Sequence, residues 1–160
     1  MENIQAARQL FLGERFGILS TISIDVPGYP FGSVTPYCAD EECRPLIYIS
    51  QIAQHTRNIL ADSRVSLTII ESKGGSGDVQ AQGRLTCIAD ARPIVGNTAS
   101  ISERYFYYFP SAKQYSQTHD FAFFRLDLVR VRFIGGFGQI CWLEPDEFMI
   151  TNPVSATPEN

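Results

Sequence analysis

Short runs of β-branched and aromatic residues recur along the first half of the chain, with turn residues between them. The first two runs, over residues 16–24 and 31–37, are joined by Asp25-Val26-Pro27-Gly28, and a Pro-Gly step is a turn signal. A third run follows at residues 46–49. A fourth, at residues 65–69, alternates apolar and polar residues as a half-buried strand does. This part of the sequence predicts hairpins and a mainly antiparallel sheet.

Three more segments with strand character follow. Residues 79–87 alternate strictly, which predicts an apolar face and a polar row of Gln80, Gln82 and Arg84 spaced about 7 Å apart. Along residues 121–133 the apolar positions change parity, which indicates a long strand with a bend or a bulge. A glycine-rich turn then leads to a last strand at residues 139–143.

Helical spacing appears in three places. Apolar residues recur at this spacing over residues 2–12, and polar residues open a short helix near Gln54. Ser100-Ile101-Ser102-Glu103 has the spacing of a capping box and predicts a third helix, rich in aromatics, that ends at Pro110. The order of elements predicts a small barrel with helical covers.

Composition limits the organisation and the class of function. A chain of 160 residues with 44% apolar and 19% charged residues fits one globular domain, expected over residues 1–150, and a flexible tail is expected over residues 151–160. The net charge is −4 and no run of Lys or Arg is present, which argues against nucleic acid as a partner.

The cysteines and the ends of the chain bear on location. The four cysteines lack CxxC spacing, which favours reduced structural thiols. The N-terminus has no signal-peptide pattern, and no stretch approaches the roughly 20 apolar residues of a membrane span. We therefore expect a cytoplasmic protein that does not enter a membrane.

The junction after residues 46–49 has the composition of an anion site. Ser50 and Gln51 precede a helix opening that carries Gln54, His55 and Thr56, and the first turn of a helix has unpaired N–H groups that favour negative charge. If Ile52 and Ile59 mark the buried stripe, His55 and Thr56 face inward as well. The alternative is an ordinary capped helix with a solvated polar turn.

Three stretches of the sequence together resemble a known family. They are the junction at residues 50–58, the segment Gly77-Asp78-Val79-Gln80-Ala81-Gln82-Gly83-Arg84-Leu85, and His119-Asp120-Phe121 continuing to the Phe-Ile-Gly-Gly-Phe-Gly turn at residues 133–138. The chain is similar to the FMN-binding split barrels of the pyridoxamine 5′-phosphate oxidase superfamily, in the branch of haem-utilisation proteins. The resemblance implies a mainly β fold, an antiparallel six-stranded split β-barrel with flanking helices.

The resemblance also implies a homodimer that binds FMN or haem at the subunit interface, for haem utilisation or degradation or for flavin-dependent oxidation and reduction. The cofactor-binding residues that it implies are Ser33, Val34, Thr35, Ser50, Gln51, Gln54, His55, Thr56, Asn58, Gln80, Gln82 and Arg84.

Two departures from the family pattern shape the alternatives. Gln54-His55 replaces the Arg-Lys pair of the vitamin-oxidising relatives, which predicts weaker phosphate binding. No histidine follows His119, whereas several haem-degrading relatives have an iron ligand near the C-terminus, so His119 is the candidate iron ligand here, or else a structural residue. A non-catalytic dimer that stores haem or docks another protein, and a dimer without a cofactor, remain as alternatives.

Overall fold

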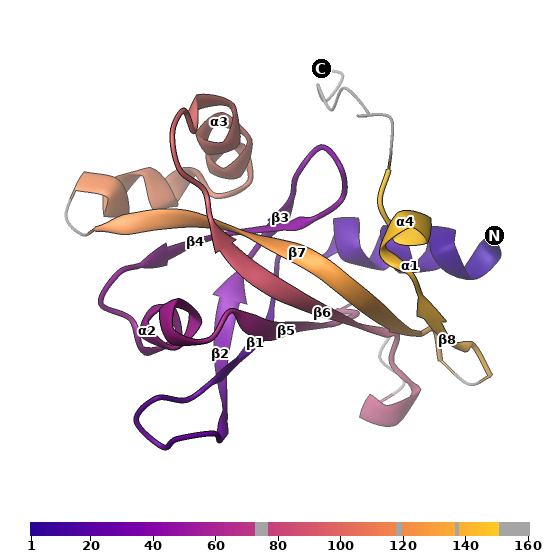
Figure 1. The fold of residues 1–160 in the computed structure, drawn as a ribbon. Helices are drawn as coiled ribbons and strands as arrows, with labels where there is room; N and C mark the ends of the chain where they lie inside the picture. Colours follow the sequence, from indigo (N-terminus) through magenta and orange to yellow (C-terminus); the bar gives the residue numbers. More distant parts are fainter. Residues whose placement is uncertain (73–76, 118–119, 137, 151–160) are drawn as a thin grey trace.

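The computed structural model describes residues 1–72, 77–117, 120–136 and 138–150 (Figure 1). The helices are α1 (Glu2–Gly13), α2 (Gln54–Ala61), α3 (Ala99–Tyr108) and α4 (Pro145–Phe148), with 3-10 helices η1 (Val79–Ala81) and η2 (Pro110–Gln117). The strands are β1 (Phe16–Ile22), β2 (Pro30–Pro36), β3 (Cys38–Ala39), β4 (Pro45–Ser50), β5 (Arg64–Ile70), β6 (Arg84–Pro93), β7 (Phe121–Ile134) and β8 (Ile140–Leu143).

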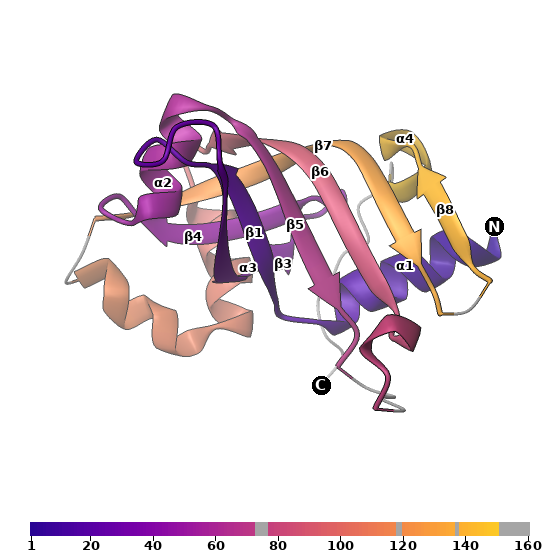
Figure 2. The ribbon, with the colours of Figure 1, turned by 90° about the horizontal axis from the view of Figure 1, so that it is seen from below.

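All eight strands of the described residues belong to one antiparallel sheet. The strand order is β2-β1-β5-β6-β7-β4-β3, and β8 pairs with β7. The sheet curls into a half-barrel, with α1 across one end and α2 at the opposite end (Figures 1 and 2). The expected mainly β fold with flanking helices is thus confirmed, although the sheet has eight strands where six were expected.

The core lies inside the curl and is closed at one end by α1. Phe11 of α1 stacks on Tyr37 with ring centroids 5.1 Å apart and meets Phe148 of α4 edge-on at 5.6 Å. The buried Tyr37 hydroxyl donates to the Phe11 carbonyl at 2.7 Å. Arg8 donates to the backbone carbonyls of Glu147, Phe148 and Met149, so the first helix also holds the last one.

A bulge in β7 explains the change of apolar parity along this strand. Ile88 of β6 lies opposite Arg130, but Ala89 lies opposite Leu128, so Val129 is an extra residue on β7. Leu126 before the bulge and Val131 after it are therefore both buried. The strand with a bend or bulge that the sequence predicts is confirmed.

Three local predictions are wrong. Residues 79–81 form η1 rather than a strand, because the Asp78 carboxylate accepts from the Gln80 N–H and caps a helical turn, so Gln80, Gln82 and Arg84 do not form one strand row. The helix after β6 begins at Ala99, before the predicted capping box, and the Asn97 side chain accepts from the Ala99 N–H. The third wrong prediction is that Ile52 marks the buried stripe of the helix, because its side chain is 78% exposed. The expected tail at residues 151–160 lies outside the described residues.

Candidate functional site

The junction between β4 and α2 is held by the end of the strand itself. The buried Thr56 hydroxyl donates to the Ser50 carbonyl at 2.6 Å, and the Ala53 N–H donates to the same carbonyl at 3.2 Å. These bonds bend the chain sharply from strand to helix. The Thr56 side chain, predicted to bind a cofactor, is therefore engaged within the chain.

Asn58 ties α2 to the first hairpin. Its side chain is fully buried, donates to the Thr21 hydroxyl at 2.9 Å, and accepts from the Ile24 N–H at 3.1 Å and from the Gln54 amide at 3.0 Å. Every polar atom of this side chain has a partner, as burial requires. Both Asn58 and Gln54, also predicted to bind a cofactor, thus hold the helix in place.

His55 lies in α2 between the anchored residues Gln54 and Asn58. The ring is half-buried, and its Nε2 atom is buried with no hydrogen-bond partner among the described residues. Burial lowers the pKa of His55, because the charged imidazolium loses its hydration. The ring is thus neutral at neutral pH and carries one N–H donor and one acceptor nitrogen.

His55 lines a cavity of about 330 Å³ in the gap between the β2 edge and β4. β2 contributes Val34 and Thr35, and the β4 end contributes Ser50. These three residues and His55 are the predicted site residues that the structure brings together. The other lining residues are Pro36, Tyr48, Ile49, Ala53, Tyr105, Phe109, Ser111, Ala112, Tyr115 and Phe121.

Aromatic rings dominate the wall of this cavity. Tyr48 stacks on Phe123 with centroids 4.4 Å apart and packs against Tyr105 at 5.6 Å, while Tyr115 stacks on Phe121 at 5.7 Å. Burial raises the pKa of Tyr105 above its ordinary value, so its phenol stays protonated. Among the described residues, neither Lys nor Arg lines the cavity, and the polar side chains that do are hydroxyls and the neutral imidazole. Such a wall suits a flat, mostly uncharged ring system.

Much of this wall comes from α3 and η2, which sequence reasoning did not assign to the site. These elements and Phe109 between them contribute five lining residues, Tyr105, Phe109, Ser111, Ala112 and Tyr115. The aromatic density of residues 105–109 signalled a buried face, but a core and a cavity wall have the same composition. The sheet register that brings β7 beside β4 is what makes it a wall.

The other predicted residues lie apart from the cavity. Gln51 is exposed, and Ser33, beside Thr35 on β2, does not line the cavity. Gln80, Gln82 and Arg84 lie at the far end of β5 and β6 from α2, where Arg84 donates to the carbonyls of Gln80 and Gln82. The iron-ligand candidate His119 lies outside the described residues.

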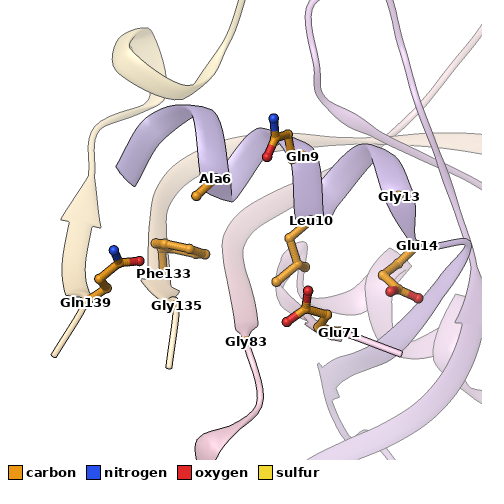
Figure 3. Close-up of a pocket in the computed structure, with 10 residues that line it drawn as sticks. All are labelled: Ala6, Gln9, Leu10, Gly13, Glu14, Glu71, Gly83, Phe133, Gly135 and Gln139. Atoms are coloured by element: carbon orange, nitrogen blue, oxygen red, sulfur yellow. The ribbon is translucent and has the colours of Figure 1, made fainter. Parts of the chain in front are cut away.

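A second hollow of about 310 Å³ lies at that far end, between α1 and the sheet (Figure 3). Glu14 and Glu71 bring carboxylates to it, and Leu10 and Phe133 form its apolar part. Glu14 accepts from the N–H and the hydroxyl of Ser72 at 2.8 and 2.9 Å. Gly83, between Gln82 and Arg84, lines the hollow, but none of the predicted site residues that the structure describes does.

Two features are absent from the described residues. No group of three or more His, Cys, Asp or Glu side chains in them is placed to hold a metal ion. None of the helices described is long and apolar enough to cross a membrane.

The curled antiparallel sheet and its flanking helices define a split barrel of the pyridoxamine 5′-phosphate oxidase type. A Clostridium acetobutylicum protein of the pyridoxinephosphate oxidase family superposes with a TM-score of 0.67 over 92% of this chain and 97% of that one, at 8% identity, which shows the fold alone. Residues 1–150 match the family model described as CREG, beta-barrel, and the chain belongs to this family.

Relatives within this fold are named for haem. The chain is 28% identical over 134 residues to the non-canonical heme oxygenase HOZ, chloroplastic, of Arabidopsis thaliana. The aligned region covers 83% of this chain and 40% of that protein. It is 29% identical over 138 residues to the heme oxygenase HutZ of Vibrio cholerae, at 82% and 76% coverage. The structure of a heme binding protein from Mycobacterium smegmatis matches with a TM-score of 0.82 and 26% identity over 91% of this chain and 59% of that one.

Proposed function

We propose that this chain is a haem-utilisation protein that binds haem in the cavity between β2, β4 and α3. The observation that carries the proposal is the aromatic cavity with the unpartnered Nε2 of His55 beside it. A buried polar atom without a partner is costly, and a ligand group that completes its hydrogen bonding removes that cost. The names of the relatives in Arabidopsis and Vibrio support haem as the ligand class.

The charge of the cavity favours haem over FMN. The phosphate of FMN is an anion that needs cationic or multiple N–H partners when it loses water, and no Lys or Arg of the part of the chain that the structure describes lines the cavity. A porphyrin ring is mostly apolar, and its carboxylates lie at one edge, where they can stay at the solvent-facing mouth. FMN remains the second candidate, because the helix opening at Gln54 and His55 lies at the same cavity.

The aromatic and the polar residues of the cavity have different roles in this proposal. Tyr48, Tyr105 and Phe109 pack on the faces of the ring system and exclude water, while Thr35, Ser50 and His55 donate or accept hydrogen bonds at its polar edge. A bound haem supplies redox-active iron, and the protein supplies its position and surroundings.

The size of the cavity supports a homodimer. At about 330 Å³ it is at the low end of ligand pockets, which run from roughly 300 to 1,000 Å³, so one subunit encloses only part of a porphyrin. Val34 lines the cavity, and its side chain is 69% exposed. It therefore also belongs to the outward face of the sheet, where Ile18 of β1 lies opposite it. Phe16, two residues before Ile18 on β1, is also exposed and extends this apolar face. A second copy docked there would border the cavity.

Hemin titration followed in the Soret region tests the ligand, with FMN titrated in parallel. We expect saturable hemin binding at one site per chain, and weaker FMN binding. His55→Ala should weaken hemin binding by more than twofold, while Ile52→Ala, an exposed change in the same segment, should leave it unchanged. Equal binding by wild type and His55→Ala would refute the assignment of the site.

Light scattering after size exclusion tests the dimer. Ile18→Lys should shift the protein toward a monomer and weaken hemin binding, whereas Val95→Lys, an exposed change in the segment after β6, should do neither. A wild-type protein that is monomeric with hemin bound would overturn the shared site.

Reductant added to the hemin complex under oxygen distinguishes degradation from storage. Loss of the Soret band with release of iron indicates haem degradation. Persistence of the band supports the non-catalytic alternative.

A further inference from the structure

A third hollow, of about 170 Å³, lies between the β3–β4 hairpin and the start of α3, two elements that lie side by side in Figure 1. Three arginines line it, Arg44 from the hairpin, Arg104 from α3 and Arg125 from β7, and the hairpin also contributes three acidic residues, Asp40, Glu41 and Glu42. Leu46, Ile94 and Ile101 give it apolar walls. It is distinct from the aromatic cavity, because α3 presents Ser100, Ile101 and Arg104 to this hollow and Tyr105 to the other.

Two of the three arginines are paired firmly. Arg44 donates its Nε to the Asp40 carboxylate at 2.7 Å, and the same carboxylate accepts from the N–H groups of Glu42 and Arg44. Arg125 donates its Nε to Asp127 at 2.7 Å. Asp40 and Asp127 therefore set the direction of these two guanidinium groups, which line the hollow beside Arg104.

Arg104 is the exception. Its side chain is only 19% exposed, and among the described residues its one ionic partner is Glu41, with Nη2 and Oε1 3.7 Å apart. No hydrogen bond of Arg104 to those residues is present, although a guanidinium has five N–H donors. Glu41 is 63% exposed, and a long pair with such a residue adds little. Most of the hydrogen-bonding capacity of this largely buried cation is thus left for a ligand in the hollow.

We infer that this hollow binds the phosphate or carboxylate group of a small anion, with Arg104 as its principal contact. A planar guanidinium matches both groups through two parallel N–H bonds. The volume is below that of a pocket for a drug-sized ligand, which suits a single anionic group rather than a cofactor. The Glu41 carboxylate pairs weakly with Arg104 in the place of the anion, and it would turn into solvent when the ligand binds.

Titrations with inorganic phosphate and with succinate, followed by the ¹H–¹⁵N signals of arginine Nε–H groups, test this inference and separate the two sources of the charge. We expect saturable shifts of the Arg104 signal with at least one probe. Arg104→Gln should weaken binding about tenfold or more. Glu41→Gln should strengthen it severalfold, because the competing carboxylate is gone, and Arg104→Lys should retain part of the affinity.

The control is Arg64→Gln, which removes one positive charge from an exposed pair with Asp62 at the start of β5. Its anion affinity should equal that of the wild type. Thermal unfolding of each variant verifies that the chain is folded. If Arg104→Gln is not folded, Arg104→Lys takes its place in the comparison. A linear shift without saturation, or the same loss of affinity in Arg64→Gln, would overturn the inference, and neither result depends on haem.

Discussion

The side-chain amide of Asn58 on α2 donates to the hydroxyl of Thr21 on β1 at 2.9 Å, and both side chains are buried. Asn58→Ala removes this bond and leaves the Ile24 N–H without its acceptor. Because an unsatisfied buried group is expensive, we expect unfolding in urea to show a loss of about 2–4 kcal/mol. Arg57→Ala on the same helix, which breaks an exposed pair with Asp25, should change stability by less than about 1 kcal/mol.

The glycine at position 17 permits the close approach of β1 and β5. A Cβ built there would lie 2.7 Å from the Thr68 carbonyl oxygen, a backbone atom that cannot move away alone. Gly17→Ala should therefore destabilise the protein by about 1–3 kcal/mol in chemical denaturation. Gly13→Ala is the matched control, because a Cβ at Gly13 has no atom within 4 Å and should be neutral or slightly stabilising. Equal stability of the two variants would contradict the packing at Gly17.

The hydroxyl of Tyr37 holds the last turn of α1 through its bond to the Phe11 carbonyl. Tyr37→Phe keeps the stacked ring but leaves this carbonyl without its partner, and we expect a lower melting temperature and a loss of about 1–3 kcal/mol. Tyr29→Phe, at a residue that is 67% exposed, should melt with the wild type. Because burial also raises the pKa of Tyr37, its phenol should not ionise up to pH 10 in an ultraviolet titration.

The lowered pKa of His55 predicts how stability depends on pH. The unfolded chain, with a histidine pKa of about 6.5, takes up a proton before the folded chain does as the pH falls. The contribution of His55 is thus fully present above that pH and is lost as the pH falls toward the lower folded-state pKa. The difference in unfolding free energy between wild type and His55→Gln should change between pH 7 and pH 5. A constant difference over this range would contradict a buried, neutral ring.

The sequence was most informative where a pattern has one structural solution. The alternation at residues 65–69, the Pro-Gly turn and the parity change in residues 121–133 each predicted a feature that the structure has. Residues 79–82 alternate equally well, yet they form a 3-10 turn, because a single carboxylate, Asp78, caps it locally. Alternation alone does not reveal such competition.

The candidate site was predictable only in part, for a related reason. The composition of the β4–α2 junction pointed to His55, but Thr56 and Asn58 look equally polar in the sequence and prove to be engaged in holding the helix. Whether a polar side chain faces a ligand or its own chain depends on tertiary partners such as Thr21, 37 positions away. The aromatic wall from α3 likewise depends on a pairing between β4 and β7 that no local pattern contains.

The extra residue in β7 has a consequence for how this chain evolves. Val129 is 54% exposed and carries little of the packing. Without it, Leu128 would still lie opposite Ala89 and Arg130 opposite Ile88, so the strand would become regular and keep the same buried faces, but it would lose the local bend and twist that a bulge adds. An aligned relative should therefore tolerate any side chain at this position, and a one-residue gap there should straighten the strand without exposing its core face.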